Sequence, residues 1–120
     1  MKTTNITIAG KQYPVQFDFQ TLLNFEQITK KAFFETNFAM IVDRMAIIMA
    51  AVLTADEDSK LTVEMLKGNG DYNAVKEIIA AYTVVMELAG EYFKVPEVVK
   101  ESEAKETEGQ GDNDEQPKNA

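Results

Sequence analysis

The feature that most constrains this chain is the stretch 36–54, which is apolar on nearly every side when it is placed on a helix. Its large side chains recur at the spacing of three and four residues that is typical of a core-facing helix. The members of this stripe are Phe38, Ile41, Val42, Met45, Ile48, Met49, Val52 and Leu53. The pattern predicts a central helix that ends near Ala55.

The opposite side of the same helix is not an ordinary polar surface. It carries Met40, Ile47 and Ala51 among small residues, and only Asp43 and Arg44 interrupt it with charge. We expect these two charged side chains to face solvent, where ion pairs contribute little to stability. A helix that is apolar nearly all round is usually buried on all sides, by its own chain or by another protein. The sequence therefore predicts that this second face contacts either a partner protein or the smaller elements of the chain itself.

The start of the chain has the alternation of a β-hairpin. Residues 4–8 and 13–17 place apolar side chains at every second position, and Gly10 lies in the link between them. Glycine readily takes the positive φ that a tight hairpin turn requires. Because a two-stranded hairpin is marginal alone, its apolar face must be covered by a helix.

Three further helices are predicted from caps and periodicity. The first covers about 19–31 after Asp18, and a short one covers 62–67 before Gly68. A last long helix begins after Asp71 and could end at Ala89-Gly90. Its expected core stripe consists of Val75, Ile78, Ile79, Tyr82, Val85, Met86, Ala89 and Phe93.

The long last helix also carries a smaller apolar pair away from its stripe, formed by Val84 and Leu88. We interpret this pair as a partner-binding candidate, together with three positions on the central helix. The candidate partner-binding residues are therefore Met40, Ile47, Ala51, Val84 and Leu88.

Charge is distributed unevenly along the chain. Residues 1–96 contain 12 acidic and 9 basic residues, whereas residues 97–120 contain 8 acidic and 3 basic ones. A segment so polar and charged cannot bury enough apolar surface to offset its conformational entropy. We predict a domain over 1–96 and a disordered acidic tail over 97–120. The domain has no basic stripe for phosphates, so nucleic acid is not an expected partner.

The chain contains no cysteine and no histidine. This removes disulfides, thiolate nucleophiles, imidazole bases and most soft-metal sites, and no spacing of acidic residues indicates a metal or cofactor site. We therefore expect no enzyme activity and no cofactor. The apolar stretch is too short for a bilayer and contains two charges, so we expect no membrane association and a cytoplasmic protein.

These elements predict an α+β fold, in which an N-terminal two-stranded β-hairpin packs on a small bundle of three main helices. The opening 6–19, followed by Leu22-Leu23-Asn24-Phe25-Glu26, resembles tail assembly chaperones of long-tailed, siphovirus-like phages and prophages. In that family a strand, a Gly-Lys turn and a second strand ending in Phe-x-Phe precede a helix. The resemblance covers about the first 35 residues.

The resemblance implies a protein that binds the long, apolar, helical tape-measure protein and keeps it soluble in the bacterial host during virion assembly. The tail tube protein is a second implied partner. Two other functions stay open, namely a small structural component of the head-tail junction or tube, and an acidic regulator that binds a basic protein. The sequence leaves the oligomeric state open, a homo-oligomer included.

Overall fold

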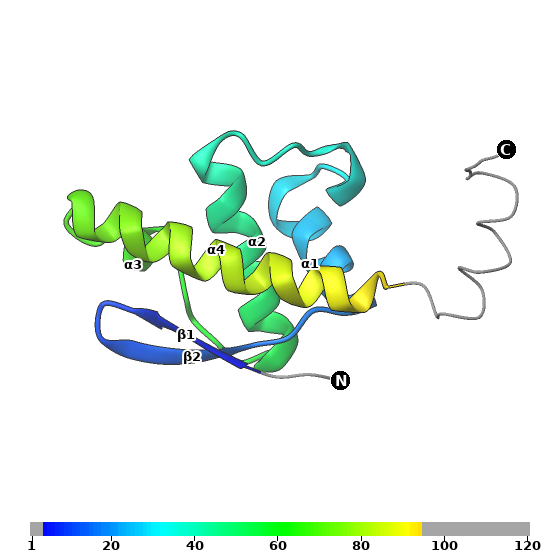
Figure 1. Cartoon of the computed structure of the whole chain (residues 1–120), viewed down its shortest axis with the longest axis horizontal. Coiled ribbons are helices and arrows are strands. Elements are labelled where there is room, and N and C mark those ends of the chain that lie inside the picture. Colours follow the sequence, from blue (N-terminus) through cyan, green and yellow to red (C-terminus); the bar gives the residue numbers. More distant parts are fainter. Residues whose placement is uncertain (1–3, 95–120) are drawn as a thin grey trace, which may run out of the picture.

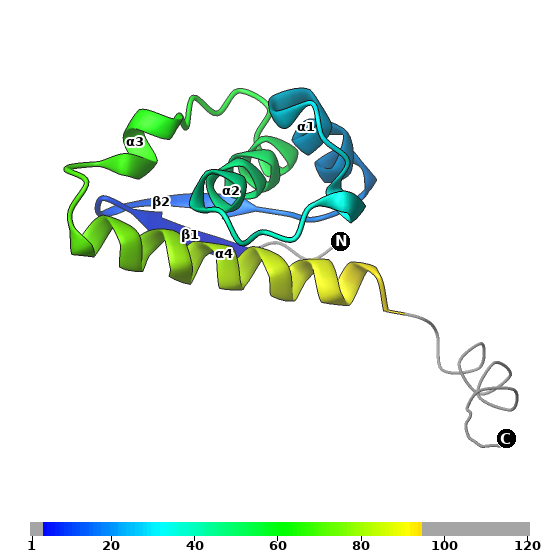
Figure 2. The same ribbon diagram turned by 90° about the horizontal axis from the view of Figure 1, so that it is seen from above.

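The computed structural model describes residues 4–94, and the predicted tail over 97–120 lies outside them. The elements follow in the order β1 (Thr4–Ile8), β2 (Lys11–Val15), α1 (Phe19–Thr29), the 3₁₀ turn η1 (Phe33–Glu35), α2 (Ile41–Ala55), α3 (Val63–Lys67) and α4 (Tyr72–Tyr92). Helix α4 runs along one side of the molecule, and α1 and α3 lie on the other side with α2 between them (Figure 1, Figure 2). The predicted α+β fold, a hairpin packed on three main helices, is confirmed.

The hairpin has a two-residue turn. Ala9 and Gly10 both have positive φ, 53° and 80°, as the twist of a two-residue hairpin requires. Ile8 pairs with Lys11 and Asn5 pairs with Pro14. Alternate residues of both strands are buried, and β1 packs against α4 while β2 packs against α2. The two helices therefore supply the cover that an isolated hairpin lacks.

Helix α1 begins at the predicted cap. The Asp18 carboxylate accepts a hydrogen bond from the Gln20 amide at 2.8 Å, and the Thr21 hydroxyl accepts one from the Asp18 amide at 3.0 Å. The helix ends at Thr29, two residues earlier than predicted, because Lys30 is left-handed with φ of 61°. Thr62 and Asp71 cap α3 and α4 in the same way.

The central helix α2 ends at Ala55 as predicted, but it begins at Ile41 and not at Thr36. The residues before it bond locally, since Thr36 donates to the Ala32 carbonyl at 2.8 Å and Asn37 accepts from the Ala39 amide at 3.0 Å. Such side-chain bonds offer the backbone an alternative to the helix. Phe38 is left-handed with φ of 60°, which a continuing helix would not allow.

The predicted core stripe of α2 is only partly correct. Ile41 and Val42 are exposed, whereas the opposite side of the helix is buried. The reason is that α2 touches α1, β2, α3 and α4, so nearly its whole circumference is covered. Its buried members are Asp43, Met45, Ala46, Ile47, Ile48, Ala50, Ala51 and Val52.

The expectation that Asp43 faces solvent is wrong. Its side chain is buried, and its Oδ1 accepts a hydrogen bond from Lys31 Nζ at 2.7 Å. Arg44 instead donates from Nε to the Phe38 carbonyl at 2.7 Å and lies over the Tyr82 ring. The two adjacent charges thus point to different neighbours, and neither pairs with the other.

Helix α4 continues through Gly90 to Tyr92, so it does not end at Ala89-Gly90, where the sequence left an end possible. It is also rotated about its axis relative to the prediction. Small residues take much of the buried side, and Val75 and Ile79 are exposed. The buried side consists of Ala74, Ile78, Ala81, Val85, Leu88 and Ala89. Alanines at this contact let the helix backbone come close to the hairpin and to α2, which large side chains would prevent.

Candidate partner-binding surface

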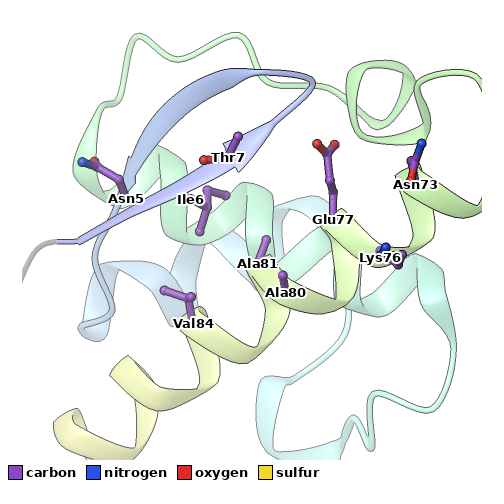
Figure 3. A pocket seen from close by; sticks show the side chains of 9 residues that line it. All are labelled: Asn5, Ile6, Thr7, Asn73, Lys76, Glu77, Ala80, Ala81 and Val84. Atoms are coloured by element: carbon purple, nitrogen blue, oxygen red, sulfur yellow. The ribbon is translucent and has the colours of Figure 1, made fainter.

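The five residues predicted to bind a partner do not form one surface. Ile47, Ala51 and Leu88 belong to the buried core, so the expectation that they face outward is wrong. Met40 is 62% exposed just before α2. Val84 is partly buried and lines a groove between β1 and α4 (Figure 3).

The burial of the second face of α2 has a clear structural cause. The segment after β2 crosses it, and the Gln16 amide donates to the Ala51 carbonyl at 3.2 Å. Helix α1 also lies on it, since Asn24 Nδ2 donates to the Ala50 carbonyl at 3.3 Å. The chain therefore covers with its own elements the face that the sequence assigns to a partner.

The apolar surface that the fold leaves open lies along one side of α4, next to its buried side. We call it the α4 flank and define it by Val75, Ile79, Tyr82, Met86 and Phe93. These residues follow one another at intervals of three, four or seven, so they lie along one side of the helix. Ile79 is 46% exposed and Val75 36%, whereas Tyr82 and Met86 are partly buried.

The start of α2 borders the middle of the α4 flank. The Phe38 ring lies 5.8 Å from the Tyr82 ring, and the Arg44 guanidinium lies 4.8 Å from the same ring. Ile41 is one helical turn before Arg44, and Met40 precedes it. Both are exposed, so they add apolar area beside the flank.

An aromatic cluster continues the α4 flank at its C-terminal end. The ring of Phe34, which is 74% exposed, lies 5.4 Å from the Phe93 ring. Phe93 also packs against Phe17 and Phe33, which are buried. These inner rings hold Phe93 in place, so the outer end of the flank is anchored to the core.

The dimensions of the α4 flank suit a partner helix. From Val75 to Phe93 the helix rises about 27 Å, at 1.5 Å per residue. Apolar anchors at intervals of three and four residues are how one amphipathic helix recognises another. Exposed large apolar side chains in a contiguous strip usually mark a binding surface.

Sequence periodicity missed this surface because it weights large side chains most heavily. It assigned Val75, Ile79 and Met86 to the core, when the close contact with the hairpin selects smaller residues. A signal was present in the spacing of Ala74 and Ala81, which lie on the neighbouring side of the helix. Small residues at helical spacing indicate close backbone approach, and this side is the one that packs inward.

Residues 4–94 bring together no group of three acidic, histidine or cysteine residues able to hold a metal ion. No helix in this part of the chain combines the length and the apolar character needed to cross a bilayer. Comparison with known protein families, with curated proteins and with solved structures finds nothing that matches this chain.

Proposed function

We propose that the protein is a tail assembly chaperone of a long-tailed phage or prophage, which binds apolar helical segments of the tape-measure protein through the α4 flank. It would act in the cytoplasm of the bacterial host, where it keeps that partner soluble during tail assembly. The resemblance of the opening 6–26 to this family supports the proposal from the sequence side.

The observation that carries the proposal is the exposed apolar area of the α4 flank, of Phe34 beside its end and of the start of α2. Phe34, Met40 and Ile79 are each about half or more exposed, at 74%, 62% and 46%. Leaving such side chains in water forgoes at most about 1.5 to 3 kcal/mol each, part of which a helical partner recovers by covering them. A chaperone for an apolar helix needs this kind of surface.

The test is a double substitution on the α4 flank, Val75→Asp with Ile79→Asp. Co-expression with a helical tape-measure fragment of a long-tailed phage should give a soluble complex for the unchanged chain. The variant should bind the fragment at least about a hundredfold more weakly, because two apolar contacts are lost and charges are placed against the partner. Circular dichroism should stay helical, since both side chains lie outside the core.

A matched control adds the same two charges on the other exposed side of α4, as Asn73→Asp with Ala80→Asp. This variant should capture the fragment as well as the unchanged chain does. Equal capture by the flank variant would reject this surface as the binding site.

The structural alternative predicts a different behaviour of the chain alone. An exposed apolar flank also supports self-association, and a head-tail or tube component should form rings at working concentration. Light scattering separates the two functions, because small species at all concentrations contradict the structural role. The third function, an acidic regulator, requires binding through residues 97–120. Full binding of a basic partner after removal of these residues would exclude that function.

A further inference from the structure

The two edges of the hairpin differ in their capacity to accept another strand. Proline has no amide hydrogen, so the pair Asn5 and Pro14 cannot exchange the two hydrogen bonds of a closely bonded pair. Antiparallel pairs alternate between bonded and non-bonded, so the peptide groups of Asn5 and Thr7 point away from β2. Both residues are exposed, and within residues 4–94 neither has a hydrogen-bond partner outside the hairpin.

The outer edge of β2, in contrast, is blocked against pairing with another strand. Pro14 lacks the donor there, and the Gln16 amide already donates to the Ala51 carbonyl. Proline and covered positions are the usual means by which proteins block an edge strand. Only β1 therefore offers an open row of donors and acceptors.

A groove lies beside the open edge of β1. Asn5, Ile6 and Thr7 form one wall, and the side of α4 that carries Glu77, Ala80 and Val84 forms the other (Figure 3). Its volume is about 500 Å³, and a second hollow of about 460 Å³ continues it past Val84 to Glu91. The Ala9 amide donates to Glu77 Oε1 at 3.0 Å, which ties the hairpin turn to α4 at one end. The groove thus has the open backbone edge of β1 on one wall and small side chains of α4 on the other.

Charge around this groove favours a basic occupant. Glu77, Glu87 and Glu91 line it, and the one lysine among its lining residues, Lys76, places its ammonium group over the Tyr72 ring. A second copy of the chain would bring the same acidic residues against them. The segment 97–120 of the chain is itself acidic, so it is also repelled.

We propose that the free edge of β1 binds an extended, basic segment of another protein by β-strand addition, with its inward side chains resting on Ala80 and Val84. Backbone hydrogen bonds to Asn5 and Thr7 give the affinity, and Glu87 and Glu91 select lysine or arginine. The site is separate from the α4 flank and does not rest on the function proposed for it.

The test uses a short peptide that alternates valine and lysine, titrated into the full chain and followed by amide NMR. The amide signals of Asn5 and Thr7 should shift and exchange more slowly with solvent, while those of β2 stay unchanged. The same peptide with alternate amides N-methylated on its bonding edge should bind at least about tenfold more weakly, because it cannot donate to β1. This comparison needs no substitution that risks unfolding the hairpin.

Charge selection is tested by Glu87→Lys with Glu91→Lys, which should weaken binding about tenfold. Glu57→Lys with Glu64→Lys makes the same change in net charge away from the groove and should leave binding unchanged. Ile79→Asp on the α4 flank should also leave peptide binding unchanged, although this substitution should impair capture of the tape-measure fragment.

Three results would overturn the proposal. One is equal binding of a peptide with glutamate in place of lysine, and another is full binding of the N-methylated peptide. The third is a dependence of the Asn5 and Thr7 signals on protein concentration without peptide, which would assign the edge to a second copy.

Discussion

At the scale of single residues, the contact between Asp43 and Lys31 shows how the fold tolerates a charge in its interior. The Asp43 side chain is 8% exposed, yet its partner ammonium group reaches it from a half-exposed side chain. Asp43 also lies in the first turn of α2, where the positive end of the helix dipole favours a negative charge. Both interactions offset the cost of removing the carboxylate from water.

We predict that Asp43→Ala lowers the free energy of unfolding by about 1 to 3 kcal/mol, since it removes a buried bonded group near a helix start. A double-mutant cycle with Lys31→Ala in urea unfolding should give a coupling of about 1 kcal/mol or less, because Lys31 is half exposed and screened by solvent. Strictly additive effects of the two changes would show that the ion pair itself contributes nothing.

The ion-pair partner of Asp43 could not be predicted from the sequence. Arg44 is its neighbour in the chain, but adjacent residues on a helix point in different directions. Lys31 belongs to the connection after α1, and its approach depends on how α1 packs on α2. The buried Thr21 is similar, because its hydroxyl lies 2.7 Å from that of Thr54, a residue far along the chain.

At the scale of elements, the hairpin turn is one place where local sequence and geometry fit poorly. Gly10 suits its φ of 80°, but Ala9 has a φ of 53°, which costs a residue with a Cβ about 1 kcal/mol. Asparagine tolerates this conformation better, and Asn-Gly is the preferred pair for a turn of this kind.

We therefore predict that Ala9→Asn raises the free energy of unfolding by about 0.5 to 1 kcal/mol, measured by urea titration. Gly10→Ala serves as the opposite control. An added Cβ there meets no atom within 4 Å, so its expected loss of about 1 kcal/mol reports backbone conformation alone. A stabilising Gly10→Ala would contradict this account of the turn.

The same scale shows why some elements were predictable and others were not. Asp18, Thr62 and Asp71 set helix starts through bonds to amides two or three residues away, so their effect is readable from sequence. The start of α2 and the rotation of α4 depend on which neighbours cover each side. The sequence placed the binding surface wrongly for the same reason. Ile47 and Val75 are both apolar, and only the elements packed around them make the first buried and the second exposed.

At the scale of the whole molecule, an apolar flank and a strong negative charge oppose each other. The chain has a formal net charge of −8 at pH 7, which keeps copies apart, while the exposed side chains of α4 favour their association. Repulsion between molecules is screened by salt, but burial of apolar surface is not.

We predict that raising the salt from about 0.05 M to about 1 M, which shortens the screening length from more than 10 Å to about 3 Å, increases self-association of the pure chain. Static light scattering should record a higher mean mass. The Ile79→Asp chain should stay at its low-salt mass, and the Asn73→Asp chain should behave like the unchanged one. An equal rise in mean mass for both variants would show that self-association uses a surface other than the α4 flank.

The unequal edges of the hairpin also limit how large an assembly built on it can become. A sheet can grow without limit only if each molecule has two strand edges open to pairing, because every added molecule must expose a new open edge. Here Pro14 and the Gln16 bond to Ala51 stop growth in one direction. Copies of the chain can therefore meet only edge to edge through β1, which limits them to pairs and protects the chain from fibre formation through this hairpin.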